Sequence, residues 1–201
     1  MQTNSPEHLR LFIAIRIPDS VKEKIVAAQT ELRRALPPEA VRWTRGEQFH
    51  LTLRFLGSVA AERLPALADA VRVVCKSFTA LQLHASGLGF FPDSRLPRVI
   101  WAGINDRQGR LPLLHRAVQF ATLGFTTEKA EETFTGHVTL GRVKHISRRE
   151  AQSLASAATG LGNGHFGQWT VNHIDIMRSE LSSEGAKHSD LAVIPLEQPL
   201  R

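Results

Sequence analysis

Two histidines of this chain stand in the same short context. Residues 50–53 read HLTL and residues 137–140 read HVTL, so the pattern His, apolar, Thr, Leu occurs twice, 87 positions apart. A strand has a side-chain period of two, which places the His and Thr of each copy on one face and the two apolar residues on the other. Histidine can give or take a proton near neutral pH, and a threonine hydroxyl can donate a hydrogen bond. Each copy therefore supplies half of an acid–base site, with His50 and His137 as the candidate catalytic residues.

A structural role is the ordinary interpretation of a single histidine in a strand, and zinc binding is another common use of a histidine pair. A zinc site needs further ligands at characteristic spacings, and the sequence contains no HExxH, CxxC or His-x-His pattern. It also lacks a GxxxxGK[ST] phosphate-binding loop. The sequence therefore predicts a site with no metal and no cofactor. The histidines without a repeated context are interpreted as structural, and His173 is the least ordinary of them because Asp175 follows on the same face: His84, His115, His145, His165, His173 and His188.

The composition is that of an ordinary globular protein. Of the 201 residues, 42% are hydrophobic and 22% are charged, and no apolar run approaches the ~18 residues of a membrane span. The first seven residues lack the basic and apolar regions of a secretory signal. The only cysteine, Cys75, can form no internal disulfide and falls on an apolar helix face, which indicates an inert core thiol. We therefore expect a cytoplasmic protein without a membrane segment.

The chain is basic, with a formal net charge of +6. An excess of positive charge favours an anionic partner such as a nucleic acid, a nucleotide or an anionic lipid. Basic residues gather near both motifs, and arginine is suited to bidentate contact with phosphate. A solvated basic edge is the alternative interpretation for part of this set, which comprises Arg42, Arg45, Arg54, Arg142 and Lys144.

Strands and helices alternate along the chain. Apolar patterning between Gly and Pro breaks predicts strands at 9–17, 41–43, 49–55, 79–85, 98–104, 135–143, 169–177 and 191–195. Helical spacing predicts helices from 20 to the prolines at 37–38, at 58–75 or from 64, at 111–121 and at 147–158. One motif strand falls in each half, which indicates a divergent internal duplication. The predicted fold class is α+β and bilobal, with two duplicated α/β lobes whose antiparallel sheets face a central cleft, in a single domain over residues 1–201.

Several local features follow from the same patterns. Residues 20–23 and 147–150 match the capping box that begins a helix. Residues 163–167 and 182–189 are predicted to be mobile.

Alternation along the first motif strand also predicts which side chains meet the cleft. Arg54 continues the series 50, 52, 54, so we expect it to border the cleft. Phe49 and Phe55 have the opposite parity and are expected in the core. Trp43 either stacks on a nucleic-acid base or packs in the core.

These residues resemble the two-histidine (2H) phosphoesterase superfamily and, within it, the RNA 2′,3′-cyclic phosphodiesterase family, often named 2′-5′ RNA ligases. The similarity covers the opening strand at 10–15 followed by a proline and a helix, the first motif at 48–57 (QFHLTLRFLG) and the second at 134–142 (FTGHVTLGR). The chain departs from the family at 135–136, where Thr-Gly replaces a frequent His-Pro pair. The segment from 179 to 196 fits the last hairpin of the family only loosely.

The resemblance implies a pseudo-two-fold axis through the cleft and a metal-free reaction. The family hydrolyses a 2′,3′-cyclic phosphate at an RNA end to a 2′-phosphate, and some relatives join RNA ends through a 2′-5′ linkage in reverse. The implied partner is an RNA with a 2′,3′-cyclic phosphate end, for which tRNA fragments are one source, or a cyclic nucleotide. No cofactor and no obligate protein partner are implied, and one chain suffices for the site, so we expect a monomer.

Opening a cyclic phosphodiester needs a base on the attacking water and an acid on the departing ribose oxygen, on opposite sides of phosphorus. By resemblance His50 is the acid on the 3′-oxygen and His137 the base, although the near-equivalent motifs do not order the two by themselves. Thr52 and Thr139 are expected to donate hydrogen bonds to the non-bridging oxygens. Arg142 is the expected phosphate contact. The roles of the histidines would exchange in ligation.

Two rival functions stay open at this point. The first is a cyclic phosphodiesterase for a small nucleotide, such as ADP-ribose cyclic phosphate or a 2′-5′ oligonucleotide. The second is a module that binds RNA or a nucleotide without turnover. The presence of both histidines and both threonines disfavours the second, because a binding module has no need of two acid–base groups.

Overall fold

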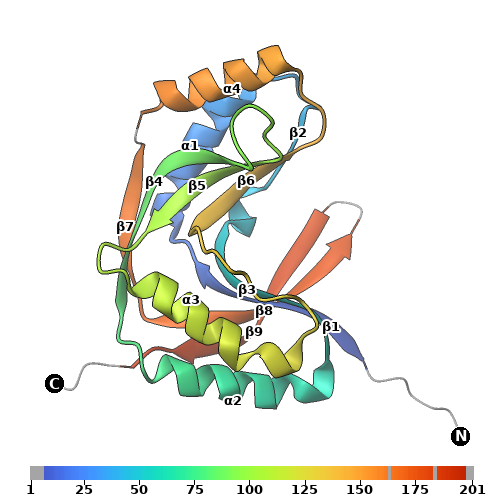
Figure 1. Ribbon diagram of the computed structural model, residues 1–201, viewed down its shortest axis with the longest axis vertical. Helices are drawn as coiled ribbons and strands as arrows, with labels where there is room; N and C mark the ends of the chain where they lie inside the picture. Colours follow the sequence, from blue (N-terminus) through green and yellow to red (C-terminus); the bar gives the residue numbers. More distant parts are fainter. Residues whose placement is uncertain (1–6, 163, 183–184, 198–201) are drawn as a thin grey trace, which may run out of the picture.

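Nine strands and four α-helices form two lobes in the part of the chain that the computed structural model describes, residues 7–162, 164–182 and 185–197 (Figure 1). The lobe with the first motif is built on a four-stranded antiparallel sheet. Its strand order is β3 (His50–Ala60), β1 (His8–Arg16), β8 (His173–Ser182) and β9 (Gly185–Pro195). Helices α2 (Leu64–Cys75) and α3 (Arg110–Ala121) pack together beneath one face of this sheet (Figure 1). The other face is turned toward the second lobe.

The second lobe holds the second motif on a five-stranded antiparallel sheet. Its strand order is β2 (Val41–Trp43), β6 (His137–Val143), β5 (Val99–Asn105), β4 (Leu81–Phe91) and β7 (His165–Val171). Helix α1 (Asp19–Arg34) contacts β7, and α4 (Arg148–Gly160) contacts both α1 and β4. Short 3-10 helices lie at Gly46–Gln48, Ala61–Arg63 and Leu123–Phe125.

The two sheets repeat one arrangement. The order β6-β5-β4-β7 in the second matches β3-β1-β8-β9 in the first, with β2 added beside β6. In each lobe the motif strand runs antiparallel to a strand that comes before it in the chain, β1 for β3 and β5 for β6. The predicted fold class, a duplicated α+β architecture with two antiparallel sheets, is confirmed.

Strand β1 is buried on both faces and shapes the floor of the cleft. Leu11 and Ile13 belong to the large core between the sheets and the helices. Phe12 and Ala14 point to the opposite face, where they form a small apolar cluster with Met177 of β8. This double burial explains why the strand is an uninterrupted apolar run.

Several strands differ from their predicted limits, and β9 begins at Gly185, six residues before the predicted start at 191. The segment predicted as one strand at 169–177 is divided into β7 and β8 at Asn172. Strands β3 and β4 continue past their predicted ends because Gly57 and Gly87, at φ of 64° and 73°, take up backbone irregularities that a side chain would resist. The sequence prediction ended both strands too early because it interpreted these glycines as turn residues.

The two predicted capping boxes have different outcomes. At α4 the box is confirmed, since the Glu150 N–H donates to Ser147 Oγ at 3.2 Å and the Ser147 N–H donates to the Glu150 carboxylate at 2.7 Å. At α1 it is wrong, because the helix begins at Asp19 behind Pro18 and no side chain caps it. Strands β7 and β9 begin within the segments predicted to be mobile, while residues 163, 183 and 184 of those segments lie outside the described residues.

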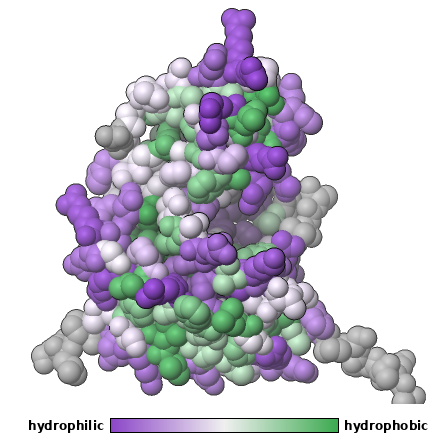
Figure 2. Space-filling view, in the orientation of Figure 1, coloured by the Kyte–Doolittle hydropathy of each residue, from purple (hydrophilic) through white to green (hydrophobic). Residues whose placement is uncertain are grey.

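A hydrophobic area is visible at the lower end of the molecule in Figure 2. The exposed large apolar residues of α2, α3 and the 3-10 helix that follows α3 are Val73, Leu113, Phe120 and Leu123. These helices contribute nothing to the cleft lining described below. Among the helices in the described ranges, none combines the length and the apolar character needed to cross a membrane.

Candidate active site

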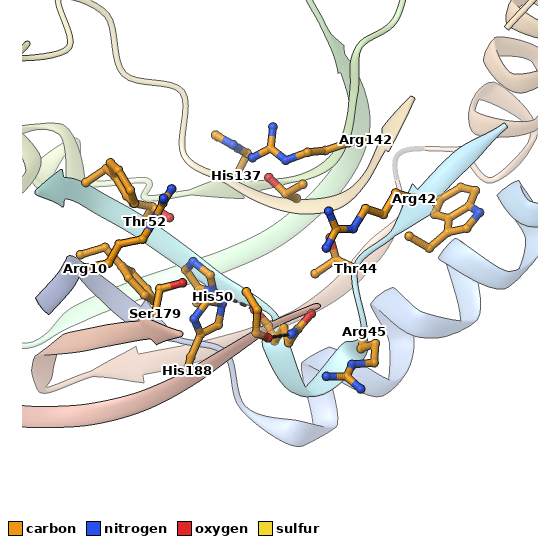
Figure 3. Close-up of a pocket in the computed structure, with 16 residues that line it drawn as sticks. Arg10, Arg42, Thr44, Arg45, His50, Thr52, His137, Arg142, Ser179 and His188 are labelled. Carbon is orange, nitrogen blue, oxygen red and sulfur yellow. Dashed lines mark hydrogen bonds between the residues drawn. The ribbon is translucent and has the colours of Figure 1, made fainter. Parts of the chain in front are cut away.

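A cleft of about 550 Å³ lies between the two lobes, and both motifs contribute to its wall (Figure 3). It is seen as a hollow with hydrophilic walls at mid-height in Figure 2. Four arginines and three histidines line it, and among the described lining residues none is acidic: Arg10, Arg42, Arg45, Arg142, His50, His137 and His188, with Phe12, Trp43, Thr44, Gln48, Thr52, Phe55, Thr139, Ser179 and Ala186. Such a lining suits an anionic ligand.

The two motif histidines enter the cleft from opposite sheets and are held in the same way. His50 begins β3 and His137 begins β6, and these strands are in contact. The Nδ1 atom of His50 lies 2.7 Å from the carbonyl oxygen of Gln48, and Nδ1 of His137 lies 2.8 Å from that of Thr135. A carbonyl only accepts, so Nδ1 carries the hydrogen in both rings. In the neutral rings Nε2 then holds a free lone pair, which is the state a general base requires.

The motif threonines share the cleft with the histidines, as strand alternation predicts. Thr52 and Thr139 are half-buried and line the cavity beside His50 and His137. Each hydroxyl can turn a hydrogen toward an anion between the two sheets.

A β-bulge directly after each threonine changes the strand alternation. In the pairing of β1 with β3, Ala14 faces Thr52 and Ile13 faces Arg54, so Leu53 has no partner. In the pairing of β5 with β6, Trp101 faces Thr139 and Ile100 faces Gly141, so Leu140 has none. The extra residue falls at the same position of the two motifs, and it moves the side chains that directly follow it to the other face of the strand.

The bulges decide which residues beyond the motifs reach the cleft. Arg142 lies on the cleft side of β6, which agrees with its expected placement. Phe55, expected in the core, lines the cleft instead, whereas Phe49 is buried as expected. Arg54, expected to border the cleft, is 2% exposed and points into the protein. Both corrections have the same cause, the extra residue Leu53.

Arg54 is fixed in the interior by hydrogen bonds to two other segments. Its Nη1 donates to Gln119 Oε1 at 2.5 Å and to the carbonyl of Lys129 at 2.7 Å, and its Nη2 donates to the carbonyl of Glu128 at 2.6 Å. Residues 128 and 129 belong to the segment that leads to His137. The buried guanidinium therefore ties the first motif strand to the approach of the second motif.

The pKa of His50 is strongly lowered by its surroundings. Burial lowers the pKa of His50 to about 4, and the nearby His188 and His137 add to the lowering, while its bond to the Gln48 carbonyl opposes it. Before an anion binds, His50 is therefore neutral at pH 7. A phosphate placed between the sheets would raise the pKa of His50 again, because a negative charge favours the protonated ring.

Two residues near His50 were missed by sequence reasoning. Phe12 lies 4.8 Å from the His50 ring, centroid to centroid, and His188 lies 5.3 Å from it, edge-on. His188 was expected to be a structural residue like the other histidines outside the motifs, but it lines the cleft from β9. No motif marks it, since β9 carries no repeat of the His-x-Thr pattern.

The other predicted contacts are divided between the cleft and its surroundings. Trp43 is half-buried, lines the cleft and also packs against the core, with the Arg33 guanidinium 5.3 Å from its ring centre. Arg42 and Arg45 line the cleft, whereas Lys144 is not among its described lining residues. Cys75 is buried in α2 as predicted, and burial raises the pKa of its thiol to about 11.

The pair His173 and Asp175 lies outside the cleft. Asp175 is fully buried, 3.3 Å from Arg16 Nε and 3.9 Å from His173 Nε2. Burial raises the pKa of Asp175. Within the described ranges, no three His, Cys, Asp or Glu side chains gather closely enough to hold a metal ion.

Comparison with known proteins places the chain among phosphoesterases. The family of LigT-like phosphoesterases matches residues 15–101. An RNA 2′,3′-cyclic phosphodiesterase of Archaeoglobus fulgidus is 32% identical over 92% of this chain and 99% of its own length. Another protein of that name, from Methanothermobacter thermautotrophicus, is 28% identical over 94% of this chain and 99% of its own length.

Solved structures share the fold. The crystal structure of TT0787 from Thermus thermophilus covers 96% of this chain and all of its own, with a TM-score of 0.76 and 26% identity. The structure of Escherichia coli LigT in complex with 3′-AMP covers the same shares, with a TM-score of 0.72 and 23% identity, which supports the fold alone.

Proposed function

This chain belongs to the LigT-like phosphoesterase family, and we propose that it is an RNA 2′,3′-cyclic phosphodiesterase that opens a terminal 2′,3′-cyclic phosphate to a 2′-phosphate. The observation that carries the proposal is the opposed pair of histidines. Each is held through Nδ1 by a backbone carbonyl, so each leaves Nε2 for proton transfer. In-line displacement at phosphorus requires two such groups on opposite sides.

In the proposed reaction the two histidines exchange their protonation states. Nε2 of His137 takes a proton from the attacking water, whose oxygen bonds to phosphorus opposite the 3′-oxygen. The bond from phosphorus to the 3′-oxygen breaks, and protonated His50 gives that oxygen its hydrogen. The products are a 3′-hydroxyl and a 2′-phosphate, with His50 neutral and His137 protonated. Each of the two roles is typically worth ~10²–10⁴ in rate.

Neighbouring side chains would stabilise the phosphorane-like transition state. The hydroxyls of Thr52 and Thr139, which line the cleft, would donate to the two non-bridging oxygens, and Arg142 in the same lining would supply a positive charge. The reaction as proposed needs no metal or cofactor and no second protein. In the reverse direction, which joins RNA ends through a 2′-5′ linkage, the histidines would exchange roles.

His50 is neutral in the free protein at pH 7, so it has to take up its proton from the solvent when the substrate binds. A cyclic phosphate carries one negative charge, and its approach raises the pKa of His50. Substrate binding near neutral pH is therefore expected to take up a proton.

The cleft favours an RNA end over an isolated cyclic nucleotide. Arg42 and Arg45 lie along one rim, where they can contact the phosphates of preceding nucleotides, and Trp43 and Phe55 offer aromatic faces for bases. A small cyclic nucleotide would use the same histidines but not the arginines on the rim. The source of the RNA, for which tRNA fragments are one option, is a further part of the proposal.

The test is hydrolysis of an RNA oligonucleotide with a 2′,3′-cyclic phosphate end in the presence of EDTA, with the position of the product phosphate determined. A 2′-phosphate product, lost in His50→Ala and in His137→Ala, is expected. Equal kcat/KM for the oligonucleotide and for its terminal cyclic mononucleotide would favour the small-nucleotide function. Tight binding without turnover would favour a binding module.

A further inference from the structure

Each motif histidine has one ring edge-on beside it and a second ring tilted against it. His137 has the ring of Phe91 edge-on at 5.1 Å, with an interplanar angle of 84°, and Trp101 at 6.3 Å. His50 has the ring of His188 edge-on at 5.3 Å, with an angle of 83°, and Phe12 at 4.8 Å. Where the second lobe places a phenylalanine, the first lobe places a titratable ring.

The position of His188 is set by its hairpin. Ser179 of β8 is its cross-strand partner and also lines the cleft. The side-chain amide of Gln48 donates to the carbonyl of Ala186, so the hairpin is attached to the same residue whose carbonyl holds His50. The Nδ1 atom of His188 is buried and has no hydrogen-bond partner among the described residues. Nδ1 is therefore closed to solvent, and the ring, which lines the cleft, can meet a ligand there through its other nitrogen, Nε2.

On the cleft side, the ionisable side chains around His188 are all basic. The groups that share the cleft lining with it are His50 on β3, His137 and Arg142 on β6, Arg10 on β1, Arg42 on β2 and Arg45 after β2, of which Arg45 pairs with Glu47 at 3.0 Å. On its own hairpin, Lys187 is exposed, Arg178 pairs with Glu180, and Asp190 pairs with Arg16. The described cleft lining offers His188 no carboxylate, so a bound anion would favour its protonated form there.

We propose that His188 is a third histidine of the anion site, which takes up a proton when an anion binds and donates a hydrogen bond to the phosphate end of substrate and product. The protonated ring of His188 suits the product best, because a 2′-phosphate monoester carries up to two negative charges and the cyclic ester only one. His188 thus adds pH-dependent affinity on the His50 side of the cleft. The proposal depends on the proposed function only for the identity of the anion.

Burial lowers the pKa of His188 in the free protein, as it does that of His50. At neutral pH the ring is therefore neutral before an anion binds, and its protonation is linked to binding. As the pH falls, less free energy is needed to protonate the ring, and affinity for a dianion rises.

Inorganic sulfate is the suitable probe, because it keeps two negative charges between pH 5 and 8, so any pH dependence of its affinity belongs to the protein. The dissociation constant of sulfate is measured by calorimetry at several pH values for the parent protein and for His188→Phe. This variant keeps an aromatic ring in the arrangement that Phe91 shows beside His137. The matched control is His165→Phe, at an exposed histidine on β7.

We expect sulfate to bind roughly tenfold more weakly to His188→Phe than to the parent at pH 6, the order of one charge-assisted hydrogen bond, and the difference to shrink toward pH 8. His165→Phe should match the parent. Equal sulfate affinity of His188→Phe and the parent at every pH would overturn the proposal.

A measurement on the unaltered protein covers the case in which His188→Phe fails to fold. The ring resonances of His188 are followed by NMR through a pH titration with and without sulfate. The proposal requires the pKa of His188 to rise when sulfate is present, and an unchanged titration would contradict it. Both measurements are independent of RNA hydrolysis, so a protein without turnover on a cyclic phosphate end would refute the proposed function and leave this test intact.

Discussion

Replacing Arg54 by methionine tests whether the first motif strand is bulged, as in the structure, or regular, as the sequence pattern predicts. The guanidinium donates three hydrogen bonds, to Gln119 Oε1 and to the carbonyls of Glu128 and Lys129. Methionine fills much of the same volume but donates none, so one buried acceptor, Gln119 Oε1, and two part-buried carbonyls lose their donor.

The expected loss of stability follows from these contacts. Hydrogen bonds to a charged group contribute about 1.5–3 kcal/mol each, and part of that is offset because a buried charge is also removed. We expect Arg54→Met to lower the free energy of unfolding by about 3–5 kcal/mol, because three acceptors lose a charge-assisted hydrogen bond and the removed burial of the charge offsets only part of that loss. Arg54→Lys keeps the charge but not the planar fork, and we expect it to lose roughly half as much.

Urea denaturation and steady-state kinetics give the two readouts. Because Arg54 holds residues 128 and 129, which lead to His137, kcat should fall in Arg54→Met while KM changes little. Arg42→Met is the matched control: Arg42 is an exposed arginine of the cleft rim, so KM should rise while stability changes by no more than about 0.5 kcal/mol. If Arg54→Met behaves like Arg42→Met, with a raised KM and full stability, Arg54 borders the cleft and the reasoning from the bulge is refuted.

Three further predictions concern the site. The pKa of His50 is lower in the folded protein than the ordinary 6.5, so the unfolded chain binds a proton at His50 first and the free energy of unfolding decreases as the pH falls from about 6.5 to 4. Between pH 7 and 4.5 the parent should lose about 2 kcal/mol more than His50→Gln in urea denaturation. Parallel losses would contradict the lowered pKa. Thr52→Val and Thr139→Val should each reduce kcat roughly 10- to 100-fold with unchanged circular dichroism; full activity of either would remove that hydroxyl from the mechanism. Arg42→Met combined with Arg45→Met should flatten the salt dependence of KM for an RNA oligonucleotide and leave that for a cyclic mononucleotide unchanged; equal effects on both substrates would mean that the rim does not contact preceding phosphates.

The limits of the sequence prediction are visible on the motif strands themselves. The period of two places His50 and Thr52, and likewise His137 and Thr139, on the cleft side as observed, because no irregularity separates the two residues of each pair. The next residue of each strand is a bulge, which depends on the pairing partner and has no signature in a leucine. Arg54 and Phe55 were therefore assigned to the wrong faces. The Arg142 placement agreed only because it came from the family resemblance and not from alternation.

His188 illustrates a different limit. Its importance comes from a hairpin far along the chain that folds back beside β1, where β9 follows β8 in the first sheet. Local patterns predict strands but not which strands become neighbours, so a histidine without a motif cannot be placed at a site from sequence alone. Similarly, the capping box at 20–23 failed because the helix begins at Asp19, with Pro18 at the N-cap, two residues earlier than the pattern requires.

The assignment of the two histidines as acid and base is tested most directly with an altered leaving group. In an RNA end whose cyclic phosphate has sulfur in place of the 3′-oxygen, the departing thiolate needs no proton, so the acid becomes dispensable while the base does not. The account predicts that His50→Ala, inactive on the oxygen substrate, recovers most of the parent rate on the sulfur substrate, and that His137→Ala stays inactive on both. Recovery by His137→Ala instead would reverse the roles, and recovery by neither would contradict acid–base catalysis by this pair.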